Sequence, residues 1–290
     1  MKRYTVKDFR KQFPNEDACL EWLKNHLYPN GIFCVKCQDV TAHHKVANRR
    51  SYSCQGCGRH IYPTANTIYH KSTTPLVDWF YATYLMSSTR CGIAAKQLER
   101  ELGCTYKTAW RMFHLIRTML DESETKIGGS GQSVEIDETW VGSKGHKRKA
   151  GVPTYKTVVA GAVERKGSVI AKVVPDTKRR TLVPFITDHV KKETMLYTDE
   201  HKSYTAMRHQ GFQHRRVNHS TKVWVRGDIH TNSIEGFWSL MKGGIRGVYK
   251  HVSPKNLQTY VDEFCFRYNR RQSAEPMFLS FLSQVRKYPY

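Results

Sequence analysis

Two pairs of cysteines have the spacing of a metal site. Cys34 and Cys37 are followed, after sixteen residues, by Cys54 and Cys57. Each Cys-x2-Cys unit can present two thiolates to one ion, and four thiolates favour tetrahedral Zn²⁺ with no open coordination position. The spacing therefore predicts a zinc ribbon with a structural role. Two alternatives stay open: a redox-active pair, or replacement of one thiolate by a histidine of the pair at 43–44.

Three acidic residues, far apart in the sequence, form a second candidate site. Asp137 and Asp199 are 62 residues apart, and Glu235 follows 36 residues after Asp199. Such carboxylates are ionised at neutral pH, and grouped carboxylates are hard ligands that suit Mg²⁺ or Mn²⁺ rather than zinc. Two such ions, ~3.5–4 Å apart, would clamp the attacking and leaving oxygens of a phosphodiester. The alternative is that all three acids are surface ion-pair partners.

The segments around these acids predict how they are positioned. Residues 133–142 alternate as in a strand, with polar Glu135, Asp137 and Thr139 on one face and apolar Val134, Ile136 and Trp140 on the other. Further strands are predicted at 156–165, 168–176, 195–200 and 214–220, with helices at 179–192 and 230–242. The acids then fall on the first strand, at the end of the fourth and on the helix after the fifth. This is the layout of an RNase H-like sheet, so the predicted fold class is α/β (α+β).

The helix predicted at 230–242 carries the remaining candidates for the catalytic site. Thr231 can cap it. Its buried stripe would contain Ile234, Phe237, Trp238 and Met241. Its other face would carry Asn232, Glu235, Ser239 and Lys242.

Residues 75–120 predict a helix-turn-helix. Two amphipathic helices, at 92–102 and 105–120, are separated by a short turn at Gly103 and Cys104. The exposed face of the second helix is expected to carry Lys107, Arg111, His114 and Arg117. A basic second helix after a short turn suits docking in the major groove of DNA. The alternative is an ordinary helical hairpin with a solvated face.

The composition favours a nucleic-acid partner. The chain has 290 residues, a formal net charge of +22 and a pI near 9.7, and both of its halves are basic. A loop after the first catalytic strand adds a basic cluster that either grips phosphate or is solvated: Lys144, Lys147, Arg148 and Lys149. No stretch approaches the ~18 uncharged apolar residues that a membrane span needs, so we expect no membrane partner and a cytoplasmic, nucleoid-associated location.

Several segments resemble a known family. VEIDETWVG at 134–142, LYTDEHKSY at 196–204, HTNSIEGFWSLMKGGIRGVYKHV at 230–252 and YVDEFCFRYNRR at 260–271 are similar to bacterial insertion-sequence DDE transposases of the ISXO-type group. That group carries an N-terminal zinc ribbon and an RNase H-like catalytic core. The resemblance extends from about residue 15 to residue 285.

The resemblance implies specific roles. Asp137 and Asp199 would be the first two members of the catalytic triad. Glu235 would be the third metal ligand, with Asn232 as its partner or substitute, and Lys242 would contact phosphate near the scissile bond. The enzyme would cleave transposon-end DNA and join the 3′-hydroxyl ends to target DNA. By analogy it would act as a homodimer or a larger assembly on double-stranded DNA.

Predicted domains are the N-terminal helix and zinc ribbon at 1–70, the helix-turn-helix at 71–125 and the catalytic domain with C-terminal helices at 126–290. Three rival interpretations stay open at this stage. The first is a non-catalytic DNA-binding regulator, which leaves the three acids unexplained. The second is an RNase H-like nuclease or resolvase that cuts without joining. The third is a domesticated, inactive copy.

Overall fold

The computed structural model describes residues 4–122, 124–142, 156–200, 202–216 and 231–288. They fold as two compact units, one formed by Met1–Met119 with Ser273–Tyr290 and the other by Leu120–Gln272. Within the described ranges, no helix combines the length and apolarity needed to cross a membrane.

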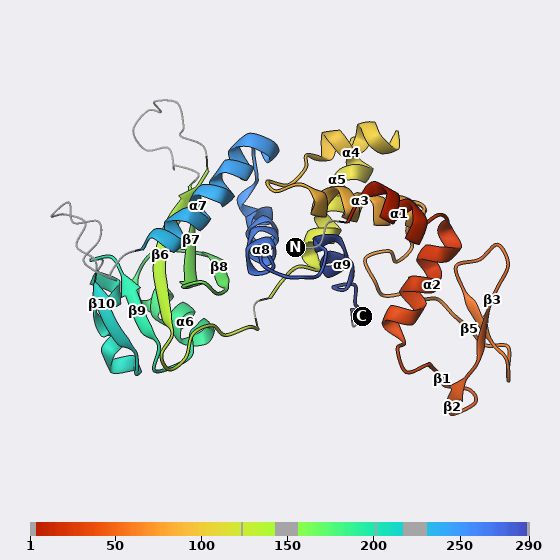
Figure 1. The fold of residues 1–290 in the computed structure, drawn as a ribbon, viewed down its shortest axis with the longest axis horizontal. Coiled ribbons are helices and arrows are strands. Elements are labelled where there is room, and N and C mark those ends of the chain that lie inside the picture. Colours follow the sequence, from red (N-terminus) through yellow and green to blue (C-terminus); the bar gives the residue numbers. More distant parts are fainter. Residues whose placement is uncertain (1–3, 123, 143–155, 201, 217–230, 289–290) are drawn as a thin grey trace. The chain divides into compact units, whose positions relative to one another are not determined.

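The first unit begins with two helices and a set of short strands (Figure 1). Thr5 caps the first helix in a reciprocal capping box with Asp8, and Asn15 caps the second, which explains why both helices start where they do. The elements are α1 (Val6–Gln12), α2 (Glu16–Leu27), β1 (Ile32–Cys34), β2 (Asp39–Thr41), β3 (His43–Lys45), β4 (Tyr52–Cys54) and β5 (His60–Ile61). β1 pairs with β2, and β3, β4 and β5 form a separate antiparallel sheet.

Four more helices complete the first unit: α3 (Leu76–Ser88), α4 (Ala95–Leu102), α5 (Tyr106–Thr118) and α9 (Met277–Leu282). The sequence-based boundaries assign residues 273–290 to the catalytic domain, and the structure differs here. Phe278 of α9 packs its ring against Phe9, Phe13 and Tyr84, with ring centroids 5.8 to 5.9 Å apart. This aromatic cluster buries the C-terminal helix among α1 and α3, so the end of the chain belongs to the first unit.

The second unit is a five-stranded sheet with the strand order β10-β9-β6-β7-β8. Its elements are β6 (Ser133–Val141), β7 (Thr157–Glu164), β8 (Val169–Val174), α6 (Arg179–His189), β9 (Met195–Thr198), the 3₁₀ helix η1 (Lys202–Gln210), β10 (Gln213–Arg216), α7 (Asn232–Gly244), the π-helical turn η2 (Ile245–Tyr249), the 3₁₀ turn η3 (Pro254–Asn256) and α8 (Leu257–Asn269). β6, β7 and β8 are antiparallel, while β9 and β10 run parallel to β6. The predicted α/β, RNase H-like fold is confirmed.

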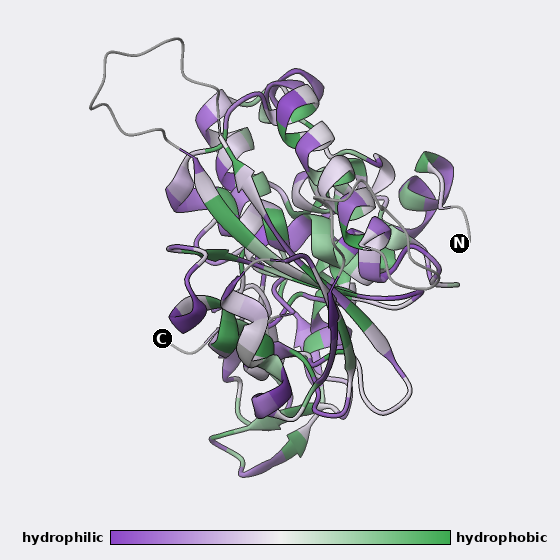
Figure 2. Ribbon diagram, turned by 90° about the vertical axis from the view of Figure 1, so that its left-hand side faces the viewer, coloured by the Kyte–Doolittle hydropathy of each residue, from purple (hydrophilic) through white to green (hydrophobic). Residues whose placement is uncertain are grey.

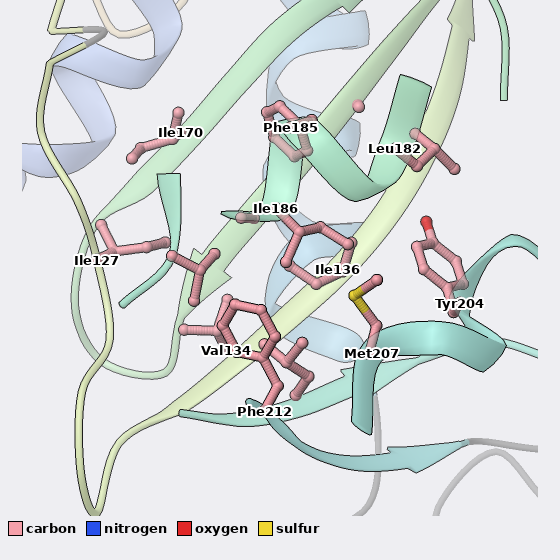
Figure 3. Close-up of a cluster of buried hydrophobic side chains, with 14 residues drawn as sticks. Ile127, Val134, Ile136, Ile170, Leu182, Phe185, Ile186, Tyr204, Met207 and Phe212 are labelled. Atoms are coloured by element: carbon pink, nitrogen blue, oxygen red, sulfur yellow. The ribbon is translucent and has the colours of Figure 1, made fainter. Parts of the chain in front are cut away.

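Helices cover both faces of this sheet. On one face, α6 and η1 pack Leu182, Phe185 and Tyr204 against Ile136 of β6 (Figure 3). On the other face, α7 and α8 pack apolar side chains against the opposite residues of the same strands. Figure 2 shows hydrophobic stretches along the strands and alternating hydrophobic and hydrophilic stretches along the helices. The strands buried on both faces are nearly continuously apolar, except where acids interrupt β6.

Candidate active site and metal centres

Two neighbouring parallel strands bring Asp137 and Asp199 together. In the pairing of β6 with β9, Glu135 lies level with Tyr197. Continuing this register by two residues brings Asp137 level with Asp199, which directly follows β9. One carboxylate oxygen from each of Asp137, Glu138 and Asp199 lies within 4.8 Å of the others. Two of the three predicted acids therefore share one small volume, and Glu138 joins them.

Glu138 is absent from the sequence-based candidates. Strict alternation along β6 assigns it to the apolar face, away from Asp137. Its Oε1 atom is buried. A carboxylate on the apolar face of a strand has little water to solvate it. An acidic residue at an apolar position of the β6 pattern is therefore a signal that could have identified Glu138.

Burial raises the pKa of two of these acids, Asp137 and Glu138. Burial raises the pKa of Asp137 to about 6, and the charges of Asp199 and Glu235 add to that effect, while hydrogen bonds from the Glu138 backbone and from Trp238 oppose it. Burial likewise raises the pKa of Glu138 to about 7, with the charges of Asp199 and Asp137 contributing and the Tyr204 hydroxyl opposing the rise. Close, partly desolvated oxygen donors fit a divalent cation, whose charge would offset this repulsion.

Trp238 holds Asp137 in place from α7. Its indole N–H donates a 2.9 Å hydrogen bond to Asp137 Oδ2. The ring fits there because Gly161 of β7 is the cross-strand partner of Asp137. A Cβ atom on Gly161 would lie 2.5 Å from the Trp238 ring, which is closer than real contacts allow. Trp238 is predicted in the buried stripe of this helix, but no sequence pattern predicts its bond to Asp137.

Glu135 fixes the start of the helix that faces the site. Its carboxylate is completely buried and accepts the backbone N–H groups of Ser233 and Ile234 at 2.8 and 3.1 Å. It also accepts the Ser233 hydroxyl at 3.1 Å and Arg165 Nε at 2.9 Å. The strand that carries Asp137 thereby caps α7, which otherwise has no side-chain cap from Thr231.

Glu235 and Asn232 occupy different places on α7. Glu235 lines a cavity of about 670 Å³ together with Asp137, Glu138 and Lys242, and its Oε1 accepts the Thr231 hydroxyl at 3.2 Å. It is not part of the close group of three carboxylates. Asn232, the first residue of α7, is exposed and is not among the residues that line this cavity.

Basic residues form one side of the same cavity. Lys242 lies two turns after Glu235, and Arg246 lies one turn further on, in η2. Burial lowers the pKa of Lys242, and the charge of Arg246 lowers it further, while Asp137 opposes this. Arg246 is absent from the sequence-based candidates, although its i+4 spacing from Lys242 is a signal that could have identified it. The cavity therefore has an acidic side and a basic side.

The four cysteines of the predicted ribbon converge. The Sγ atoms of Cys34 and Cys57 lie 3.5 Å apart, and those of Cys37 and Cys54 lie 3.8 Å apart. Zn–S bonds of ~2.3 Å in a tetrahedron place sulfurs ~3.8 Å apart, so the group fits zinc. A Cβ on Gly56 would come within 3.3 Å of Cys37 Sγ, which explains the glycine in the second knuckle. The two histidines of β3 are not members of this group.

The helix-turn-helix region differs from the prediction at Arg117, which is buried, and His114 is only partly exposed. α4 and α5 form as expected, with Gly103 in a left-handed conformation between them and Thr105 capping α5. Lys107 and Arg111 are exposed, and His114 stacks on Trp110 with ring centroids 5.0 Å apart.

The prediction that Arg117 is exposed is wrong, because only 2% of its surface is accessible. Arg117 follows Phe113 by one turn, and its guanidinium lies 5.8 Å from the centre of that ring, so it faces the core side of the helix. The loop cluster of Lys144, Lys147, Arg148 and Lys149 lies outside the described residues.

The fold and the two sites define a zinc-ribbon protein with an RNase H-like core, the class that includes DDE transposases. Residues 128–269 match the family model described as the ISXO2-like transposase domain, and residues 14–60 match the transposase zinc-ribbon domain. An uncharacterized transposase-like protein of Haemophilus influenzae is 30% identical over 122 residues, which are 42% of this chain and 96% of that protein. The chain therefore belongs to the ISXO2-like family of transposases. DNA binding and DNA recombination follow from this membership.

Other comparisons cover most of the chain. A protein in the transposable element ISH50 of Halobacterium salinarum is 25% identical over 280 residues, which are 89% of this chain and 92% of that protein. A chain of the simian T-cell lymphotropic virus intasome in complex with PP2A regulatory subunit B56 gamma is similar at 16% identity and a TM-score of 0.33. The similarity covers 72% of this chain and 75% of that chain. A pre-cleavage Mos1 transpososome matches 72% of this chain and 79% of its own, at 11% identity and a TM-score of 0.28.

Proposed function

We propose that this transposase cleaves DNA at the ends of its insertion sequence and joins the freed 3′-hydroxyl groups to target DNA. The observation that supports this most directly is the gathering of Asp137, Glu138 and Asp199 where β6 runs past the end of β9. The cavity beside them also contains Lys242 and Arg246, which suit a phosphate between an acidic and a basic side.

The acidic residues of the site would bind metal ions, and Lys242 would bind the DNA. Asp137 and Asp199 would hold Mg²⁺ or Mn²⁺. Glu235 is the proposed third ligand, and Asn232 is its alternative. When bound, two such ions supply charge stabilisation at the attacking and leaving oxygens. Lys242 would bind a phosphate oxygen and align the strand for in-line attack.

Other parts of the chain would bind DNA and zinc and support assembly. Lys107, Arg111 and His114 would contact transposon-end DNA through α5, and the loop residues Lys144, Lys147, Arg148 and Lys149 would grip phosphate. Zn²⁺ would hold the ribbon through Cys34, Cys37, Cys54 and Cys57. A transposase joins two DNA ends, so we propose a homodimer or a larger assembly that works at the nucleoid in the cytoplasm.

The direct test is cleavage of DNA that contains the element's own ends, with Mg²⁺ present. Wild type should cut at the ends, and Asp199→Asn should bind the same DNA without cutting it. A variant that cuts as fast as wild type would overturn the proposed catalytic role.

A second assay separates transposition from simple nuclease activity. Pre-cut ends with free 3′-hydroxyls are incubated with a target plasmid and Mg²⁺. Joined products support strand transfer. Cleavage of intact ends with no joining of pre-cut ends would instead support the nuclease or resolvase.

A further inference from the structure

A second cavity, of about 420 Å³, lies beside the catalytic one. The two cavities share Lys242 and Arg246 as lining residues. The second cavity is also lined by Trp140 at the end of β6, and by Lys250 and His251 after η2. Its volume is in the range of small-ligand sites, and its lining combines an aromatic ring with several basic side chains.

Trp140 is unexpectedly accessible for a residue of this type. The alternation of β6 assigns it to the apolar face with Val134 and Ile136, which are buried, yet 50% of Trp140 is exposed. It lies three residues beyond Asp137 on the same strand. A large exposed indole costs hydration free energy unless something covers it, and a nucleobase offers a flat π-face of suitable size.

The backbone at the rim of this cavity is held in an unusual shape. α7 continues into the π-helical turn η2, and Lys250 after it has φ +62° and ψ −54°. The His251 N–H donates to the Tyr249 carbonyl at 2.6 Å, which closes a γ-turn of the rare, strained kind with positive φ. π-helical turns and residues with strained backbone dihedral angles concentrate at functional sites. Here they bring Lys250 and His251 to the same cavity as Trp140.

We propose that this second cavity binds one nucleotide of the DNA strand next to the phosphate being cut. The base would stack on Trp140, and the adjoining phosphate would pair with Arg246 and Lys250. The proposal rests on the proposed function, because it places the reacting phosphate in the catalytic cavity. The shared Lys242 and Arg246 would then contact successive phosphates of one strand. Stacking on Trp140 would fix the position of the flanking nucleotide relative to the cut phosphate, whichever base it carries.

The test uses the full-length protein and a single-stranded oligonucleotide with one 2-aminopurine near its 3′ end, in a Ca²⁺ buffer without chelator so that the zinc ribbon stays intact. Stacking on an indole quenches 2-aminopurine emission. We compare wild type with Trp140→Ala, Trp140→Phe and the control Leu240→Ala. Leu240 is also exposed, lies on α7 and lines neither cavity.

Wild type and Leu240→Ala should quench equally. Trp140→Ala should lose the quenching and bind about tenfold more weakly, and Trp140→Phe should keep most of the affinity. Trp140→Ala should leave the salt dependence of binding unchanged. Arg246→Ala should reduce the steepness of the plot of log binding constant against log salt concentration by about one, because one phosphate contact is lost. Equal quenching and affinity in Trp140→Ala and Leu240→Ala would overturn the proposal.

The same variants separate this proposal from the proposed function. If wild type cleaves element-end DNA but Trp140→Ala matches Leu240→Ala in binding, the nucleotide site is wrong and the catalytic proposal stands. If stacking depends on Trp140 but no Mg²⁺-dependent cleavage or joining occurs, the nucleotide site stands and the catalytic proposal fails. Circular dichroism of each variant checks that the fold is retained.

Discussion

At the scale of single residues, the position of Asp137 depends on its hydrogen bond from Trp238 and on the space that Gly161 leaves for the Trp238 ring. Trp238→Phe removes the N–H that donates to Asp137, at 2.9 Å, while keeping an aromatic ring. We expect cleavage to slow about tenfold to a hundredfold, because partners that orient a metal ligand typically contribute that much. The Mg²⁺ concentration for half-maximal cleavage should rise. An unchanged Mg²⁺ dependence would mean that the bond does not orient Asp137.

Gly161→Ala tests the same arrangement from the opposite strand. The new Cβ would lie 2.5 Å from the Trp238 ring and force it away from Asp137, so cleavage and stability should both fall. Gly236→Ala is the matched control, because a Cβ there meets nothing within 4 Å. Equal activity of the two variants in the cleavage assay would show that this close packing is unimportant.

His214 makes stability depend on pH. Burial lowers its pKa to about 4 from 6.5, with the charges of Arg216 and Arg208 adding to this. The folded chain thus keeps His214 neutral, whereas the unfolded chain protonates it near pH 6.5. The stability contribution is complete above that unfolded-state pKa and is lost as the pH falls towards the folded-state value.

Between about pH 7.5 and about pH 5 the loss from this group should be about 1–2 kcal/mol, as measured by urea unfolding. His214→Gln should show a correspondingly smaller difference between the two pH values, since it cannot titrate. A variant with the same pH dependence as wild type would exclude His214 as the source.

At the scale of elements, the strand that carries Asp137 also holds the helix that carries Glu235. Glu135→Ala removes the acceptor for the start of α7 and the buried partner of Arg165. We expect a loss of about 3–5 kcal/mol in urea unfolding, with loss of cleavage, and a smaller loss for Glu135→Gln. The exposed control Glu124→Ala should stay within about 0.5 kcal/mol of wild type. A Glu135→Ala protein as stable as that control would refute the capping role.

Much of this arrangement could be predicted from sequence because it follows from local pattern. The alternation at 133–142 predicts β6, and the cysteine spacing predicts the ribbon. Parity along a strand assumes neighbours on both sides, but the pairing of β6 with β9 ends at Glu135, and the assignments of Glu138 and Trp140 to the buried apolar face fail beyond that point. The burial of Arg117 and the packing of residues 273–290 depend on contacts across the fold, which no local pattern contains.

At the scale of the whole molecule, the proposed zinc site and the proposed catalytic metal site should act independently. A zinc chelator should release one zinc per chain and make residues 31–62 sensitive to protease, because structural zinc supplies folding free energy to small ribbons. Peptides from the β6–β9 sheet should stay protected, since that sheet has its own core. Cys57→Ser should reproduce the effect without chelator. Full protease resistance after zinc removal would argue against a structural ion.

We propose that acids from β6 and the end of β9 hold divalent cations. A crystal of the full chain grown with MnCl₂ tests it by anomalous scattering. We expect a manganese peak within about 2.2 Å of carboxylate oxygens of both Asp137 and Asp199, and no such peak in Asp199→Asn. Ordered Asp137 and Asp199 side chains with no manganese between them would contradict the account.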